Sequence, residues 1–99
     1  MTDGSTGATP PQGPHGPLIE YPVDYPFKVI GLAADDLAAH VRLLVQGAAP
    51  GLAIGEPELR PSSGGKYLSV TLTVGLASED QRRAVYLALS RDPRVVQYL

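Results

Sequence analysis

An alternating run of apolar and polar residues between positions 66 and 76 constrains the fold more than any other feature. Successive side chains of a β-strand point to opposite faces, so a period of two separates the residues into two sets. One set is wholly apolar and consists of Leu68, Val70, Leu72, Val74 and Leu76. The other set is polar but uncharged and consists of Tyr67, Ser69, Thr71 and Thr73. The run predicts a central strand with one buried face and one open face.

A first helix is predicted from residue 37 onward. Its apolar residues recur at i, i+4, i+7 and i+8, which places them on one side of a helix. They are Leu37, Val41, Leu44 and Val45. Asp35 and Asp36 stand before them, where carboxylate oxygens can cap the first N–H groups and suit the positive end of the helix. Gly47 and the Pro50-Gly51 pair are expected to end the helix.

A second helix is predicted after the alternating strand. Ser78, with Gln81 three residues later, forms a capping box at its start, and Pro93 stops it. The expected inner face consists of Val85, Ala88 and Leu89. The charged residues expected on the outer face are Glu79, Arg82 and Arg83.

Three further strands complete the pattern. Phe27–Leu32 is β-rich, Ala53–Arg60 is interrupted by Pro57, and Val95–Leu99 closes the chain. Because proline lacks an N–H, the Pro57 strand belongs at a sheet edge or carries a bulge, and we expect it at an edge. The order β-α-β-β-α-β, with right-handed crossovers, predicts an α+β ferredoxin-like βαββαβ sandwich. Its four-stranded antiparallel sheet has both helices on one face, and the strands beginning at Phe27 and Lys66 are central.

Residues 1–17 differ in composition from the rest of the chain. They are rich in Pro, Gly, Ser and Thr and contain almost nothing that could be buried. Such a segment cannot offset the entropy lost on ordering, which predicts a disordered tail. Residues 18–99 then form a single domain.

Charge and composition exclude several classes of protein. All eight basic residues, and all but one of the ten acidic residues, lie after residue 17, so the domain is near neutral. Nucleic-acid binding normally requires a basic excess, which argues against such a partner. The chain contains no apolar run long enough to cross a bilayer, no secretory signal and no cysteine. We expect a soluble, cytoplasmic protein that does not bind membranes.

Three stretches resemble the YbeD-like family of small, uncharacterised bacterial proteins. They are Phe27-Lys28-Val29-Ile30-Gly31, Ala49-Pro50-Gly51 and, most specifically, Pro61-Ser62-Ser63-Gly64-Gly65-Lys66-Tyr67-Leu68-Ser69-Val70. The resemblance covers residues 21–99, and the tail is expected to be peculiar to this chain. It implies a ferredoxin-like fold similar to the ACT domains that regulate metabolic enzymes. It implies no activity and no site residues, since this fold hosts many functions.

No combination of residues indicates catalysis. His15 lies in the tail, and His40 lies beside the apolar stripe of the first helix, as a boundary residue does. The acidic pairs at residues 35–36 and 79–80 are explained by helix capping and the helix dipole. No ligands have the spacing of a metal site. We expect no enzyme activity, no metal and no cofactor.

The turn at residues 61–65 has two interpretations. Backbone N–H groups of Ser62, Ser63, Gly64 and Gly65, with the charge of Lys66, could hold a phosphate. A phosphate loop, however, normally opens a helix, whereas this one opens a strand, so a hairpin connection is favoured.

The open face also has two interpretations. Tyr67 could stack on an RNA base, but the next outward positions of the strand lack a second aromatic residue. With Lys28 and Ile30, the hydroxyl-bearing side chains otherwise form a mild surface that another subunit could cover. We expect self-association, as a homodimer through the sheet edges.

The resemblance to ACT domains suggests one ligand site. A glycine after the first strand lets a ligand approach the backbone in those domains, and Gly31, followed by Asp35 and Asp36, is similarly placed. A glycine that eases the exit of a strand is the simpler explanation. We expect a regulatory or binding module that senses a small metabolite or docks on a protein partner. The alternative is a nucleic-acid-associated protein that uses the open face around Tyr67.

Overall fold

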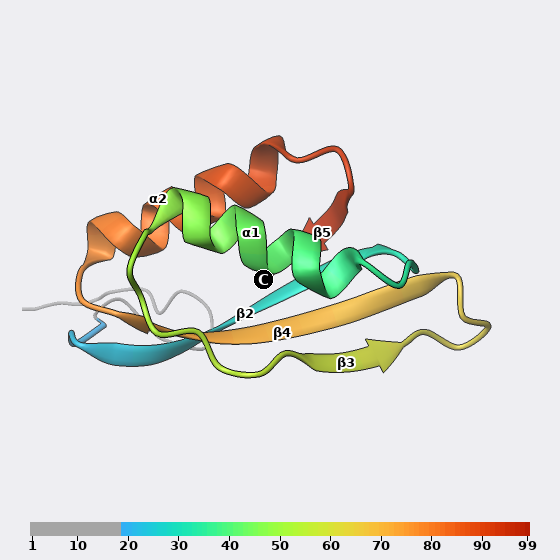
Figure 1. Cartoon of the computed structure of the whole chain (residues 1–99), viewed down its shortest axis with the longest axis horizontal. Coiled ribbons are helices and arrows are strands. Elements are labelled where there is room, and N and C mark those ends of the chain that lie inside the picture. The colour runs from blue at the N-terminus through green and yellow to red at the C-terminus, as the bar shows by residue number, and fades with distance from the viewer. Residues whose placement is uncertain (1–18) are drawn as a thin grey trace, which may run out of the picture.

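The computed structural model describes residues 19–99, and the predicted tail lies outside these residues. The elements are β2 (Val23–Leu32), α1 (Leu37–Ala48), β3 (Glu58–Pro61), β4 (Tyr67–Leu76), α2 (Glu79–Arg91) and β5 (Val95–Tyr98). The strands form one antiparallel sheet in the order β3-β4-β2-β5. Both helices cover the same face of this sheet, and the other face is left open (Figure 1). The ferredoxin-like prediction is confirmed, with the two predicted strands at the centre.

The core lies between the sheet and the two helices. The predicted alternation of β4 is confirmed, because its apolar side chains point into this layer and its hydroxyls point out of it. The fully buried side chains are Phe27, Val29, Leu37, Val41, Val45, Val70, Leu72, Val74, Leu76, Val85 and Leu89. Within residues 19–99, no helix is long and apolar enough to cross a membrane.

Strand β2 begins at Val23, four residues before the predicted start, and continues through Pro26. Pro26 is tolerated because of the direction in which its missing N–H would point. The N–H and C=O of Lys28 both bond Leu99, on the β5 side of β2. Backbone groups two residues apart in a strand point the same way. Pro26 therefore faces the β5 side, where no described strand pairs with it.

The predicted strand at residues 53–60 is divided in two. Ile54 forms an isolated bridge with Val74, and regular pairing with β4 resumes only at Glu58. Pro57 lies between the two parts and cannot donate a ladder hydrogen bond. The edge position predicted for this segment is confirmed by the sheet order.

The predicted capping is confirmed at the start of α2 but not at the start of α1. At α2 the Ser78 hydroxyl accepts a hydrogen bond from the Gln81 N–H at 3.3 Å, as predicted. The Gln81 side chain accepts from the N–H of Ala77 at 2.7 Å rather than from that of Ser78. At α1 Asp36 occupies the cap position, but its side chain caps no N–H group. The capping prediction is wrong for Asp36, because its carboxylate binds Arg94 instead.

Candidate functional site

The open face of the sheet carries rows of side chains that cross three strands. Lys28 of β2 lies opposite Thr71 of β4, which in turn lies opposite Glu58 of β3. Two residues further along, Ile30, Ser69 and Arg60 form the next row in the same way. Directly opposed residues of antiparallel strands point to the same face. The register therefore gathers two cations, one carboxylate and two hydroxyls on the open face.

Two adjoining hollows lie among these rows. The larger, of about 390 Å³, is lined by Lys28, Glu58, Leu59, Arg60, Ser69 and Thr71. The smaller, of about 150 Å³, is lined by Lys28, Ile30, Arg60, Pro61, Ser62, Tyr67 and Ser69. They share the side chains of Lys28, Arg60 and Ser69, so the two form one continuous depression.

The turn that leads into β4 uses its own backbone donors. Ser62 donates its N–H to the Tyr67 carbonyl at 2.9 Å, and Gly65 donates to the Ser62 carbonyl at 2.8 Å. The Ser62 hydroxyl accepts from the Tyr67 N–H at 3.0 Å. Gly64 and Gly65 have φ of 87° and 75°, a region that favours glycine in tight turns. This geometry is that of a hairpin connection. The N–H groups of Ser62 and Gly65 are bonded within the turn, so they are not available to bind a phosphate.

Tyr67 is half-buried at the end of the open face nearest this turn. The Nζ atom of Lys66 lies 5.5 Å from the centroid of its ring, within range of a cation–π contact. Tyr67 also lines the smaller hollow, together with Ser62. The structure thus brings Ser62 and Tyr67 together on the open face, beside Lys66. Ser63, Gly64 and Gly65 form the exposed tip of the turn.

Gly31 is buried at the other predicted site. A Cβ atom on this residue would lie 2.7 Å from the Arg94 carbonyl oxygen and 3.3 Å from both Cδ atoms of Leu37. The space that a ligand would need next to Gly31 is occupied by the chain's own helix and loop. The glycine therefore has a packing role, and its predicted ligand role stays a prediction.

Arg94 connects Asp36 to Gly31, because its carbonyl lies against Gly31 and its guanidinium binds Asp36. The Asp36 carboxylate accepts two hydrogen bonds from the Arg94 guanidinium, at 2.8 and 3.2 Å, and these bonds lower the pKa of Asp36. Asp35 is exposed and makes no ion pair with any described residue. A hollow of about 230 Å³ lies beside this pair and is lined by Leu32, Ala33, Ala34, Pro93, Arg94 and Val96. Its lining is mostly apolar, and Arg94 is its only charged residue.

A cluster around Glu79 joins the start of α2 to the segment that precedes β2. Arg82 donates two hydrogen bonds to the Glu79 carboxylate, at 3.0 and 2.8 Å, and Tyr21 donates a third at 2.5 Å. These donors, the Arg82 bonds above all, lower the pKa of Glu79 to about 2. Hydrogen bonding to Glu79 also raises the pKa of Arg82 against the effect of its partial burial.

Arg82 was expected on the outer, solvent-exposed face of the second helix. This prediction is wrong, because its side chain is partly buried against two tyrosine rings. Its guanidinium carbon lies 5.7 Å from the ring centroid of Tyr25 and 5.4 Å from that of Tyr86. The two tyrosine hydroxyls lie 3.0 Å apart, and burial is the main cause that raises the pKa of Tyr86. No local pattern indicates these contacts, because their partners are 57 to 61 residues apart in the chain. The cluster links the sheet to α2.

His40 is half-exposed at the boundary of α1, as expected. Its Nε2 atom lies 2.8 Å from Oδ2 of Asp92, and Oδ1 of Asp92 accepts the Arg94 N–H at 2.9 Å. Because Asp92 directly follows α2, the contact between His40 and Asp92 links α1 to the end of α2. Among residues 19–99, no three His, Cys, Asp or Glu side chains are placed to hold a metal ion.

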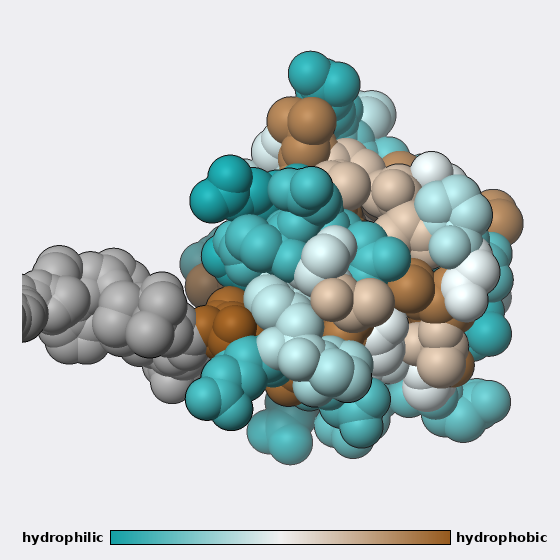
Figure 2. Space-filling view, turned by 90° about the vertical axis from the view of Figure 1, so that its left-hand side faces the viewer, coloured by the Kyte–Doolittle hydropathy of each residue, from teal (hydrophilic) through white to brown (hydrophobic). Residues whose placement is uncertain are grey.

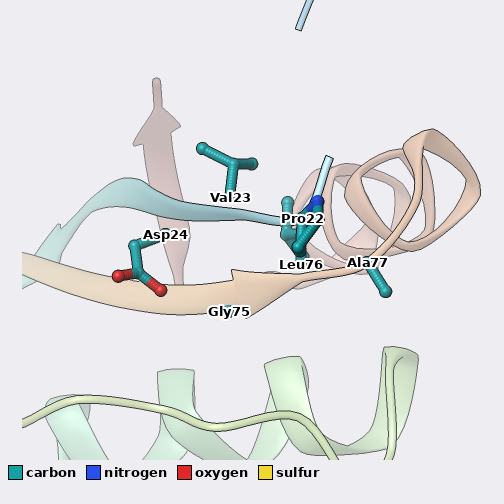
Figure 3. Close-up of a pocket in the computed structure, with 6 residues that line it drawn as sticks. All are labelled: Pro22, Val23, Asp24, Gly75, Leu76 and Ala77. Atoms are coloured by element: carbon teal, nitrogen blue, oxygen red, sulfur yellow. The ribbon is translucent and has the colours of Figure 1, made fainter. Parts of the chain in front are cut away.

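A further hollow, of about 310 Å³, lies at the end of the sheet where β2 begins and β4 ends. Figure 3 shows Asp24 and Val23 on opposite sides of β2, next to the bare backbone of Gly75. The lining residues are Pro22, Val23, Asp24, Gly75, Leu76 and Ala77. The surface at this end is mainly hydrophilic, with small separate hydrophobic areas (Figure 2). With a single ionisable side chain, this hollow is a weaker candidate than the depression on the open face.

Comparisons with known proteins place the chain in a family. The model of the family described as "Protein of unknown function (DUF493)" matches residues 16–99. The UPF0250 protein RSc0326 of Ralstonia nicotianae is 47% identical over 96 residues, which cover 96% of each chain. A UPF0250 protein of a Janthinobacterium species is 46% identical over 78 residues, 79% of this chain and 86% of the relative.

A solved structure agrees in fold. The solution structure of HP0495 from H. pylori has a TM-score of 0.65 at 22% identity, and the match covers 94% of this chain and 98% of that one. The match to the Ralstonia protein includes most of residues 1–17, so this segment is not peculiar to the chain, contrary to expectation. The resemblance to the YbeD-like proteins is confirmed by the family model and by these relatives. The chain belongs to the DUF493 family of proteins of unknown function.

Proposed function

We propose that this protein is a non-enzymatic, cytoplasmic binding module that holds a small metabolite or docks a protein partner on the open face of its sheet. The observation that carries the proposal is the continuous depression beside Lys28, Arg60 and Ser69, which no described segment covers. Its larger part has a volume typical of small-molecule sites, about 300 Å³ or more. A regulatory role, similar to that of ACT domains, rests on likeness of fold.

The absence of an enzyme activity is supported by how the titratable side chains are used. Catalytic groups need a base or nucleophile that faces a cavity. His40 is turned to Asp92, and Glu79 is bound by Arg82 and Tyr21. Glu58, Ser69 and Thr71 do line the depression on the open face, but among the described residues no hydrogen bond pairs the Glu58 carboxylate with either hydroxyl, so no nucleophile there is activated by a base.

The proposed module is a homodimer, formed by pairing of the β5 edges of two copies. The other edge strand, β3, is guarded by Pro61, Glu58 and Arg60, and such residues discourage edge pairing. β5 reads Val-Val-Gln-Tyr and carries neither proline nor charge. Because Leu99 directs its N–H and C=O toward Lys28, those of Tyr98 point to the free edge. A two-fold axis would pair this edge with itself.

Apolar side chains beside β5 support the same interface. Leu32, Val96 and Leu99 are each more than half exposed, and Val96 and Leu32 line the hollow beside Arg94. A second copy of the chain would cover these side chains. The hollow is then a second place for a ligand, at the boundary between subunits.

A nucleic-acid-associated role is the second candidate. The smaller part of the depression places Tyr67 next to Lys28 and Arg60, which is the combination of a stacking ring and phosphate-binding cations. Glu58 in the adjoining part would repel a polyanion. Binding of this kind would weaken steeply with salt and depend on Tyr67.

The proposed function is tested by amide NMR spectra of the full chain, titrated with pooled metabolites and then with short RNA. We expect shifts on β3 and β4 beside the depression with one metabolite pool. Shifts confined to residues 31–37 would move the site to the hollow beside Arg94. Shifts at Tyr67 with RNA, lost at high salt, would favour the second candidate. The absence of any shift would count against a small-molecule role.

A further inference from the structure

We propose that the depression on the open face is a site for a small oxyanion, the carboxylate or phosphate group of a metabolite, held between Lys28 and Arg60. This inference rests on the proposed function, because it uses the same surface, and it adds the class of ligand. Neither the sequence pattern nor the family match assigns a ligand to these residues.

The register places the two cations on either side of β4. Lys28 lies on β2 opposite Thr71, and Arg60 lies on β3 opposite Ser69. Their backbones are two strand spacings apart across the sheet and two residues apart along it, about 12 Å in all. Both side chains nevertheless line both parts of the depression. An anion seated above β4 would therefore meet a cation from each side.

The two cations are available for a ligand. Arg82 and Arg83 bind Glu79, and Arg94 binds Asp36. By contrast, neither Lys28 nor Arg60 has an acidic partner within 4.0 Å among residues 19–99. Glu58 stands two residues from Arg60 on the same side of β3 and still forms no ion pair with it. The depression thus has two positive charges that are not ion-paired, against the single negative charge of Glu58.

The floor of the depression supplies uncharged hydrogen-bond donors. The side chains of Ser69 and Thr71 project from β4 between the two cations and are partly exposed. A hydroxyl can donate to an oxyanion while charge-assisted bonds from lysine and arginine hold it from the sides. Arginine suits this role because its planar guanidinium binds two oxygens of a carboxylate or phosphate at once.

Glu58 limits the size and charge of the ligand. Its carboxylate lines the larger part of the depression, on the side of β3. A polyanion laid across the sheet would bring several negative charges to this carboxylate, whereas a single small oxyanion between Lys28 and Arg60 would be repelled by it only modestly. The charge pattern therefore selects a compact anion over a nucleic-acid backbone.

The test uses inorganic phosphate and, separately, succinate as probes, each titrated into the full chain at constant ionic strength. Amide shifts of Ser69 and Thr71 and the Nε–H signal of Arg60 report binding. We expect saturable shifts with at least one probe. Lys28→Gln and Arg60→Gln should each weaken binding about tenfold, since a hydrogen bond to a charged group is lost. Arg91→Gln, which removes the same charge from exposed Arg91 at the end of α2, should leave binding unchanged.

Glu58→Gln gives a second test of the same geometry. Removing the nearby negative charge should tighten binding by about twofold to fivefold. Equal weakening by Arg91→Gln, or no saturable shift with either probe, would overturn the oxyanion site. Saturable shifts on the same face with uncharged metabolites alone would also overturn it, yet leave the proposed function standing. Preference for phosphate or for succinate identifies the group that the site accepts.

Discussion

The backbone of Gly31 lies directly against the carbonyl of Arg94, at a distance that leaves no room for a side chain. A Cβ atom on Gly31 would be 2.7 Å from that oxygen, a separation that real Cβ atoms essentially never show. The pairing of β2 with β5 shifts register at the same place, between Ile30 and Gly31. The absence of a side chain at Gly31 thus lets β2 pack closely against both the loop that contains Arg94 and Leu37 of α1.

Gly31→Ala is expected to destabilise the fold by about 1–3 kcal/mol, since an added methyl group must displace backbone. Gly47→Ala is the matched control, because a Cβ there meets nothing within 4 Å in the exposed part of α1. Gly47 lies in the last turn of α1, where alanine should raise stability by up to about 0.5–1 kcal/mol. Urea denaturation of both variants measures the difference. Equal stability of the two variants would contradict the packing role of Gly31.

This contact also changes how a ligand site near Gly31 can be tested. A Gly31→Val substitution cannot separate a ligand role of Gly31 from its role in packing. Because its side chain would meet Arg94 and Leu37, the substitution would disturb packing whether or not a ligand binds. Ala34→Trp is a cleaner test, since Ala34 is exposed and lines the neighbouring hollow.

Acid should destabilise the protein partly through Glu79. Its pKa is about 2 in the folded chain, against an ordinary value of 4.5, because Arg82 and Tyr21 bind the ionised form. The carboxylate therefore contributes stability above pH 4.5, and this contribution is lost as the pH falls toward 2. Glu79→Gln should lower stability at pH 7 and show a weaker loss between pH 4.5 and 2.

Asp80→Asn provides the control for Glu79. Asp80 is the next residue of α2, is exposed and makes no ion pair within the described part of the chain. Its replacement should leave the acid transition close to that of the parent. Denaturation midpoints measured from pH 7 to pH 2 compare the three proteins. An unchanged acid dependence in Glu79→Gln would show that the cluster contributes nothing to it.

Arg82 and Arg83 bind the same carboxylate and should differ in importance. The Arg82 side chain is 25% exposed and lies over two tyrosine rings, whereas that of Arg83 is 75% exposed. Arg82→Met should cost about 1–2 kcal/mol through the lost hydrogen bonds and cation–π contacts. Arg83→Met should change stability by less than about 0.5 kcal/mol. Thermal denaturation of the pair measures this, and equal effects would argue against the stacked position of Arg82.

Most of the fold could be predicted from the local spacing of apolar residues in the sequence. The alternation from Leu68 to Leu76 and the stripe from Leu37 to Val45 each fix a buried face, and the two faces meet in the core. The start of β2 was misplaced because Pro26 normally excludes a central strand. Pro26 is tolerated because its N–H side faces the β5 side of β2, where no described strand pairs with it. The side of a strand that is left unpaired depends on the sheet order and leaves no local signal in the sequence.

The candidate site was predictable only in part. Alternation in β4 predicted an open face with Tyr67, Ser69 and Thr71, and Lys28 was expected beside them. Glu58 and Arg60 were not predicted to lie on this face, because regular pairing of β3 with β4 begins only after the break at Pro57. Periodicity assigns a side chain to a face, but pairing across strands decides which side chains become neighbours.

Val96→Lys should abolish self-association. In the proposed dimer the β5 edges of two copies pair across a two-fold axis, so a lysine in each copy would place like charges close together. Val96 is 59% exposed, and its replacement should not disturb the core. Leu43→Lys is the control, since Leu43 is 66% exposed on α1, outside the β5 edge. Sedimentation equilibrium of the three proteins is the measurement. A dimer that persists in Val96→Lys, or that is lost equally in Leu43→Lys, would place the interface elsewhere, and a monomeric parent would refute the homodimer.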